Sequence, residues 1–483
     1  MATRTVGTGG REVPGPAGLP LLGSMFDLRN DSLGTFLAAR RAHGDVVRVW
    51  GGPPGMRVEV YGVFSAAGAQ QVLATGSANF RKDNVFYEEV RESFGNGLLT
   101  AQDDDYLRQR RLVQPLFTRR RVDGYAAAVA AETERMLAGW GESPDGTGRV
   151  DLVAEMTRFT LRTVARILFG TDVEAAIAVV ERCFPVIGDY VLRRGYSPAS
   201  LPRHWPTPDN RRAAAATAEL YAVCDRIIAA RRAAGGAAPE GGSAFGDGTA
   251  PGAGTALETG GDDLLTLLAA AGNAEDGSFD AAELRDQVLI FLLAGHETTA
   301  TSLAFALHLL AKHPEQQARA REEVRRVLGD RTPGAADADA LPYLTQVLKE
   351  AMRLYPAAPV IGRRAVAATE IDGQLVPAGA DVIVAPWVTH RHPRYWPDPE
   401  RFDPDRFTPE AEKARERYAW FPFGGGPRAC IGQHFSMLES VVALAMVLRA
   451  YELEAVTQEV PVGAGITLRP LGPAHCRLRP ATP

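Results

Sequence analysis

The residues with the clearest chemical potential lie near the carboxyl end, in the stretch FGGGPRACIG that runs from Phe423 to Gly432. Cys430 precedes a long apolar segment that predicts a helix, so its sulfur is expected near a helix N-terminus, where free backbone N–H groups favour a thiolate. Such a thiolate can act as a nucleophile or as a metal ligand. The stretch has neither the lysine nor the hydroxyl residue of a P-loop, which excludes that kind of phosphate site. Its glycines would let a broad, flat group approach, and Arg428 offers a partner for a carboxylate.

A second set of polar residues interrupts an apolar segment in the middle of the chain. Asp280 and Glu283 have the spacing of a capping box and predict the start of a helix that crosses the molecule. Val288–Ala294 is apolar on every face, which predicts a buried helix centre, yet Gly295–Thr299 (GHETT) follows at once. A threonine beside a carboxylate can pass protons to a bound ligand. The alternative is a water-filled groove in which Thr298 bonds back to a carbonyl and bends the helix.

A third feature is the pair Glu350 and Arg353 in the stretch LKEAMRLYP. Residues three apart lie on one helix face and can form an ion pair. Taken alone, this spacing is more typical of an exposed surface pair.

Composition excludes several classes of protein. The chain of 483 residues has a net charge of −5, so no overall basic field would attract nucleic acid or an anionic membrane. Its four cysteines are far apart and predict neither a zinc site nor a disulfide framework. No run of 18 apolar residues and no signal-like leader is visible, which predicts a cytoplasmic protein without a membrane span.

The remaining pattern positions these groups on helices. Amphipathic spacing predicts helices over Leu33–Arg41, Tyr125–Trp140, Thr157–Phe169 and Arg211–Arg232, and β-branched runs predict hairpins over Val46–Tyr61 and Asp372–Pro386. Residues 233–261 are rich in glycine and alanine and predict a mobile loop, or alternatively a linker between two domains.

Together these motifs resemble the cytochrome P450 family of haem-thiolate monooxygenases, of the soluble bacterial type. FGGGPRACIG matches the family's haem loop, AGHETT its oxygen-binding motif, KEAMR its E-x-x-R pair and PERFDPDRF its meander. The resemblance implies one mainly α-helical domain over residues 1–483 with small sheets, and a haem between the long central helix and the cysteine loop. The loop at 233–261 falls where the family tolerates insertions.

The resemblance also implies roles for single residues. Cys430 would be the axial thiolate of haem b, with Phe423 packed beside the sulfur, and thiolate ligation favours O–O cleavage. The haem propionates would meet Arg428, Arg363, Arg110 and Tyr106, the last standing where the family usually has tryptophan. Thr298 would hydrogen-bond the oxygen under activation and Glu297 would relay protons. Glu350 and Arg353 would form a structural triad with Arg406, which we prefer over Arg401. The expected wall of the substrate pocket is Leu99, Leu293, Ala294, Ala358 and Val360.

The implied activity is hydroxylation or epoxidation of a hydrophobic small molecule, such as a fatty acid, terpenoid or polyketide, with dioxygen. No flavin or iron–sulfur domain is visible, so electrons would come from a separate ferredoxin or flavodoxin, and the six arginines of Arg108–Arg121 are a candidate docking patch. We expect a monomer. Two alternatives are a non-oxidising haem sensor or carrier, and a haem-thiolate enzyme that uses peroxide; the pair Glu297 and Thr298 favours dioxygen activation over both.

Overall fold

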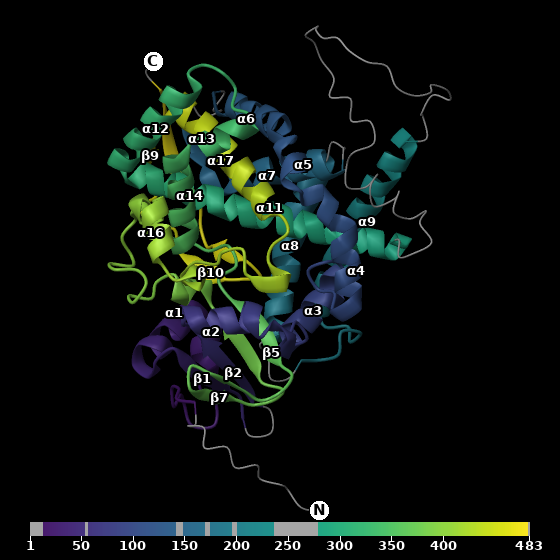
Figure 1. Ribbon diagram of the computed structural model, residues 1–483. Coiled ribbons are helices and arrows are strands. Elements are labelled where there is room, and N and C mark those ends of the chain that lie inside the picture. The colour runs from purple at the N-terminus through teal and green to yellow at the C-terminus, as the bar shows by residue number, and fades with distance from the viewer. Residues whose placement is uncertain are drawn as a thin grey trace, which may run out of the picture.

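The computed structural model describes residues 13–53, 57–141, 148–169, 174–195, 200–235 and 279–481, and it is mainly α-helical (Figure 1). The low-complexity stretch predicted at 233–261 lies outside the described residues from 236 onward. The helices are α1 (Met25–His43), α2 (Ala66–Gln70), α3 (Val85–Phe94), α4 (Asp103–Val113), α5 (Arg119–Asp123), α6 (Ala126–Gly141), α7 (Leu152–Phe169), α8 (Glu174–Gly195), α9 (Pro208–Gly235), α11 (Ala281–Lys312), α12 (Pro314–Leu328), α13 (Ala335–Ala340), α14 (Pro342–Leu354), α15 (Pro386–Thr389), α16 (Pro409–Ala414) and α17 (Gln433–Ala450).

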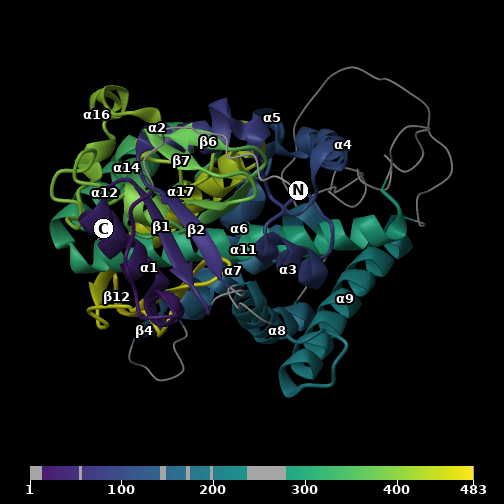
Figure 2. The same ribbon diagram turned by 90° about the horizontal axis from the view of Figure 1, so that it is seen from below.

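Helix α11 runs through the middle of the molecule, with other helices around it and the largest sheet toward one end (Figures 1 and 2). The predicted capping box is present, because the Asp280 side chain accepts from Glu283 N and the Glu283 side chain accepts from Asp280 N. Residues 288–293 are buried, as predicted, whereas Ala294 at the end of the predicted segment is exposed and lines the cavity. The helix is long and apolar enough to cross a membrane by composition, but most of it is buried against other helices, which is typical of a core helix.

The strands form one larger sheet and three small ones. The five-stranded sheet has the order β1 (Val46–Gly51), β2 (Val58–Val63), β8 (Asp381–Val384), β5 (Ile361–Ala365), β3 (Phe80–Arg81). The smaller sheets pair β4 (Arg149–Asp151) and β9 (Tyr451–Ala455) with β12 (His475–Pro480), β6 (Thr369–Ile371) with β7 (Gln374–Val376), and β10 (Val462–Ala464) with β11 (Leu468–Pro470).

One of the two predicted hairpins is confirmed. β1 and β2 pair antiparallel from Val46 opposite Val63 to Gly51 opposite Val58. The hairpin predicted over Asp372–Pro386 is wrong, because β7 pairs with the preceding strand β6 and β8 joins β2 and β5 in the larger sheet. The turn lies at Asp372 and Gly373, which both have positive φ, as a two-residue hairpin turn requires.

Candidate active site

One apolar cavity of about 300 Å³ collects most of the residues singled out from the sequence. Helix α11 forms one wall, the loop before α17 forms another, and the segment leading into β5 closes a side. The cavity is lined by these predicted residues: Leu99, Tyr106, Arg110, Ala294, Thr298, Ala358, Arg363, Phe423, Arg428 and Cys430. Residues separated by more than 300 positions in the sequence therefore meet around one space.

The cysteine loop is held in a fixed shape by its own backbone. Cys430 N donates to Phe423 O at 2.9 Å, and α17 begins three residues after the cysteine. Gly424 and Gly426 have φ of +70° and +63°, a region that favours glycine.

The glycines of this loop serve two purposes, and only one of them was expected. Gly424 and Gly432 line the cavity and leave room there. A Cβ on Gly426 would lie 2.0 Å from Leu73 O, and one on Gly425 would lie 2.5 Å from the Tyr418 ring. These two glycines therefore allow the loop to pack against the protein rather than against a ligand.

Cys430 lines the cavity and is exposed there. Burial raises the pKa of Cys430, while the Gly432 N–H and the charges of Arg110 and Lys82 act to lower it. The Gly432 N–H lowers the pKa, as the sequence predicted for a helix N-terminus, but among the protein groups alone burial outweighs this effect. Because a coordinated thiol is deprotonated outright, a bound metal would overcome the effect of burial.

Four cations line the same cavity: Lys82, Arg110, Arg363 and Arg428. Burial lowers the pKa of Arg428 to about 10, and it also lowers the pKa of Arg363. The pKa of Lys82 lies well below its usual value because the side chain is buried and because the charges of Arg363 and Arg428 are close to it. Within the described ranges, no carboxylate lies within ion-pair distance of any of the four. Such a cluster is suited to a ligand with more than one negative charge.

Sequence reasoning missed Lys82, and for Tyr106 it missed a contact with the cysteine loop. Lys82 Nζ donates to Leu99 O at 3.2 Å and is fully enclosed, whereas the polar stretch RKDN around it reads as an exposed turn. The Tyr106 hydroxyl donates its single hydrogen to Pro427 O at 2.8 Å, and the hydroxyl oxygen accepts from Arg110 at 2.8 Å. Tyr106 therefore braces the cysteine loop, and its contact with a haem propionate stays a prediction.

On α11 the acid and the hydroxyl of the predicted pair point into different spaces. Thr298 lines the cavity and donates to Ala294 O at 2.8 Å, so the bond back to a carbonyl occurs at the cavity wall. Glu297 instead lines a separate pocket of about 30 Å³ beside Asp189 and Arg469, which form an ion pair. Adjacent residues on a helix are about 100° apart, which accounts for the divergence.

The other polar residues of the central motif have protein partners. Burial lowers the pKa of His296, whose ring packs 5.3 Å from Phe184 by centroids, so a neutral core histidine is favoured. The Thr299 hydroxyl is hydrogen-bonded to Ser436 on α17 at 3.1 Å.

Two residues predicted for the pocket wall lie elsewhere. Leu293 is buried and faces the small pocket beside Glu297, because it is on another face of α11 from Ala294. Val360 lines a different small pocket, since alternate residues of the extended segment before β5 point to opposite sides. Leu98, Ile290 and Ile361 line the cavity instead.

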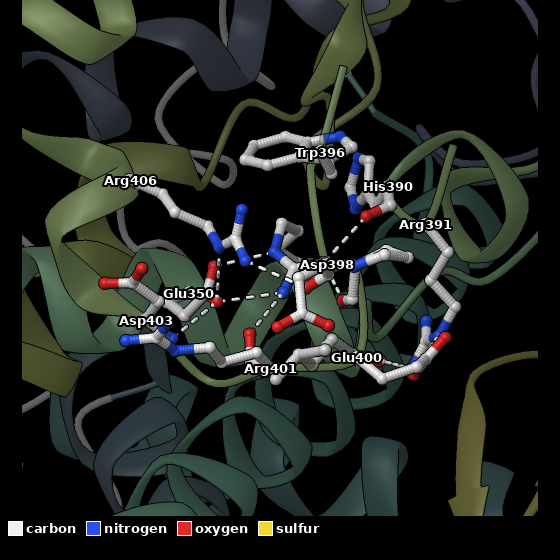
Figure 3. Close-up of polar contacts among 12 residues, drawn as sticks. Glu350, His390, Arg391, Trp396, Asp398, Glu400, Arg401, Asp403 and Arg406 are labelled. Carbon is white, nitrogen blue, oxygen red and sulfur yellow. Dashed lines mark hydrogen bonds and ion pairs between the residues drawn. The ribbon is translucent and has the colours of Figure 1, made fainter. Parts of the chain in front are cut away.

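Glu350 and Arg353 form a fully buried ion pair. Figure 3 shows Glu350 with Arg401, Asp403 and Arg406 around it. Arg353 donates twice to the carboxylate, at 2.6 and 2.8 Å, and also to the carbonyls of His390, Pro399 and Arg401. Arg406 approaches the same carboxylate at 3.5 Å, whereas Arg401 contributes only its carbonyl, so the geometry agrees with the choice of Arg406.

A sequence profile described as Cytochrome P450 matches residues 13–476. The chain belongs to the cytochrome P450 family. It is 36% identical to cyclooctatin synthase and 35% identical to cyclooctat-9-en-7-ol 5-monooxygenase, both of Streptomyces melanosporofaciens; these matches span 92% and 91% of this chain and 91% and 89% of the relatives.

A third relative and a solved structure agree with this assignment. Pentalenene oxygenase of Streptomyces avermitilis is 33% identical, over 91% of this chain and 90% of the relative. The crystal structure of the cytochrome P450DA heme domain superposes with a TM-score of 0.80 and 26% identity, covering 98% of this chain and 97% of that one. The predicted family and fold are confirmed, and the chain is an oxidoreductase of the P450 monooxygenase class.

P450 enzymes bind haem through a cysteine thiolate, and the residues present fit that group. A thiol opens on the cavity, and four cations without carboxylate partners among the described residues line the same space. Gly424 has only Ile361 near the position of its missing Cβ, at 3.9 Å, so the loop leaves free space on the cavity side.

Proposed function

We propose that this P450 uses dioxygen to hydroxylate or epoxidise a terpenoid. The supporting observation is that Cys430 and Thr298, from opposite walls, line one cavity whose other lining is mostly apolar. Sequence left fatty acids, terpenoids and polyketides open. Relatives named for cyclooctat-9-en-7-ol and pentalenene favour a cyclic terpenoid.

The cofactor we assign is haem b, which supplies dioxygen activation when bound. Cys430 would hold its iron, and Lys82, Arg110, Arg363 and Arg428 would hold its two propionates. Tyr106 keeps the loop around Arg428 in place, through its bond to Pro427 O.

Thr298 holds a hydroxyl at the cavity wall, and its bond to Ala294 O orients the oxygen lone pairs away from the helix carbonyl. Glu297 has no hydrogen-bonded or ion-paired side-chain partner in the described part of the chain, so its carboxylate in the small pocket is available to hold a proton. Protons from this pocket would reach the cavity through the neighbouring Thr298. The apolar lining excludes water elsewhere.

Electrons would come from a separate ferredoxin or flavodoxin. Residues 422–424 and Ala429 line both the cavity and a surface hollow of about 710 Å³, so only the cysteine loop separates the two spaces. Glu412 and Glu416 also line this hollow, but they pair with Lys349 and Arg394. The exposed side chains of Lys413 and Arg417 beside them suit an acidic carrier.

The docking patch predicted over Arg108–Arg121 is divided by the structure. Arg108 pairs with Asp105 and Glu283, Arg110 faces the cavity, and Arg119 pairs with Asp339. Arg111 and Arg120 are exposed, but the arginines are spread over α4 and α5, so we propose the hollow as the docking surface.

We further propose a single cytoplasmic domain that acts as a monomer. One hydrophobic cluster includes residues from Leu33 to Leu478, which supports a continuous core.

The reduced protein should give the carbon monoxide difference spectrum of a thiolate-ligated haem, and Cys430→Ser should abolish it. The ferric spin state should then respond to cyclic terpene hydrocarbons or alcohols, and the responding compound should gain one oxygen atom in the presence of a ferredoxin system. A thiolate spectrum that survives Cys430→Ser would overturn the proposed ligand. Titration by fatty acids but by no terpenoid would overturn the proposed substrate class.

A further inference from the structure

The loop of residues 95–102, between α3 and α4, covers the cavity and carries two of its apolar side chains, Leu98 and Leu99. It lies directly on α11: a Cβ on Gly97 would be 2.7 Å from Ile290 Cγ1, and Gly95 has a φ of +82°. The loop has no regular secondary structure of its own. Its position must therefore come from bonds to its neighbours.

Two fully buried glutamines, Gln109 on α4 and Gln287 on α11, supply such bonds, and we call them the amide bridge. Leu98 N donates to Gln287 Oε1 at 3.1 Å, Gln287 Nε2 donates to Gln109 Oε1 at 2.7 Å, and Gln109 Nε2 donates to Asn96 O at 2.9 Å. The bonds form a circuit from the loop to α11, then to α4 and back to the loop. A buried amide without its partner is costly, so the circuit favours one loop position.

Asp286, the residue before Gln287 on α11, ties the same loop to helix α9. Asp286 Oδ2 accepts from Asn96 N at 2.8 Å, and Asp286 Oδ1 accepts from the Tyr221 hydroxyl of α9 at 3.1 Å. One turn of α11 thus holds both the loop and α9.

We propose that Gln287 and Gln109 determine substrate orientation by positioning Leu98 and Leu99. Neither glutamine lines the cavity, so both act through the leucines. The hydrogen bond from Leu98 N to Gln287 fixes how far the side chains of Leu98 and Leu99 reach into the cavity. The part that concerns substrate rests on the proposed function, whereas the positioning of the loop does not.

The test compares Gln287→Leu, Gln109→Leu and the double variant with Gln317→Leu in the holoenzyme. Gln317 is a buried amide on α12 with three bonds to Leu310 and Leu453, away from the cavity, so it matches the loss of a buried amide without touching the loop. The first readout is hydrogen exchange of the peptide that contains Leu98. The second is the distribution of oxidised positions in the product.

Gln287→Leu should speed exchange at Leu98 by about tenfold, the effect of one lost hydrogen bond. Gln109→Leu should give a smaller change, and both should broaden the product distribution while Gln317→Leu leaves it unchanged. Unchanged exchange in Gln287→Leu overturns the proposal whatever the activity. Equal broadening by Gln317→Leu overturns the role in orientation. Faster exchange without oxidation of any terpenoid would refute the proposed function and support the positioning.

Discussion

Replacement of Arg353 by methionine should be far more damaging than the same replacement at Arg406. Arg353 is fully buried and donates two of the three close bonds to the Glu350 carboxylate, as well as bonds to three carbonyls; the third bond to Glu350 comes from Asp403 N. Breaking a buried pair and leaving its partner charged costs about 3–5 kcal/mol, and unpaired buried carbonyls add to this. Arg406 is 3.5 Å from Glu350 and donates to one carbonyl, so its loss leaves the buried pair intact and should cost about 1–2 kcal/mol.

The assay is guanidinium-induced unfolding followed by tryptophan fluorescence. Trp396 is a suitable reporter, since its ring lies 5.1 Å from the Arg353 guanidinium. The double variant Glu350→Leu, Arg353→Met should unfold at a higher denaturant concentration than Arg353→Met alone, because it removes the stranded charge. Equal midpoints for Arg353→Met and Arg406→Met would refute the assignment of Arg353 as the main partner.

Three further predictions concern proton-carrying groups. Thr298→Ala should release more peroxide per electron pair consumed, and unchanged coupling would contradict the role of its hydroxyl. Burial raises the pKa of Glu439 well above 4.5, so above that pH the folded protein holds a proton that the unfolded chain has lost, and stability falls as the pH rises. Glu439→Gln should remove this fall. A difference in Tm between the two proteins that does not change with pH would contradict the prediction. Burial lowers the pKa of His308 to about 4, so the stability that is present above pH 6.5 is lost as the pH falls through 4. His308→Leu should avoid up to about 3 kcal/mol of this loss, which unfolding measured as a function of pH would show.

The motif residues were predictable because each has a residue type that suits only a few kinds of chemistry. A lone cysteine in a glycine loop and a carboxylate beside a threonine in an apolar helix stand out from any ordinary core. The side of the helix on which each of these residues lies was harder to predict. Because α11 is apolar all round, no hydrophobic face shows which side meets the cavity, and so Leu293 was placed on the wrong side.

Residues whose role depends on tertiary contacts could not be recognised from the sequence around them. Lys82 lies in a stretch that reads as a polar turn, and its burial depends on the elements packed around it. Gln109 and Gln287 are ordinary helical residues until the loop at 95–102 packs on them. The hairpin at Asp372 is different, since its Asp-Gly pair is a known turn signal that favours β6 and β7 over the predicted strands.

The packing of the cysteine loop also determines when it can form during folding. Gly426 lies against Leu73, Tyr106 bonds to Pro427 across 321 residues, and Arg428 bonds to Ala101 across 327. Contacts of such high sequence separation close late, because the entropy of the intervening chain must be lost first. The loop therefore reaches its final shape only after nearly the whole chain has been synthesised, and capture of the cofactor belongs to the last stage of folding.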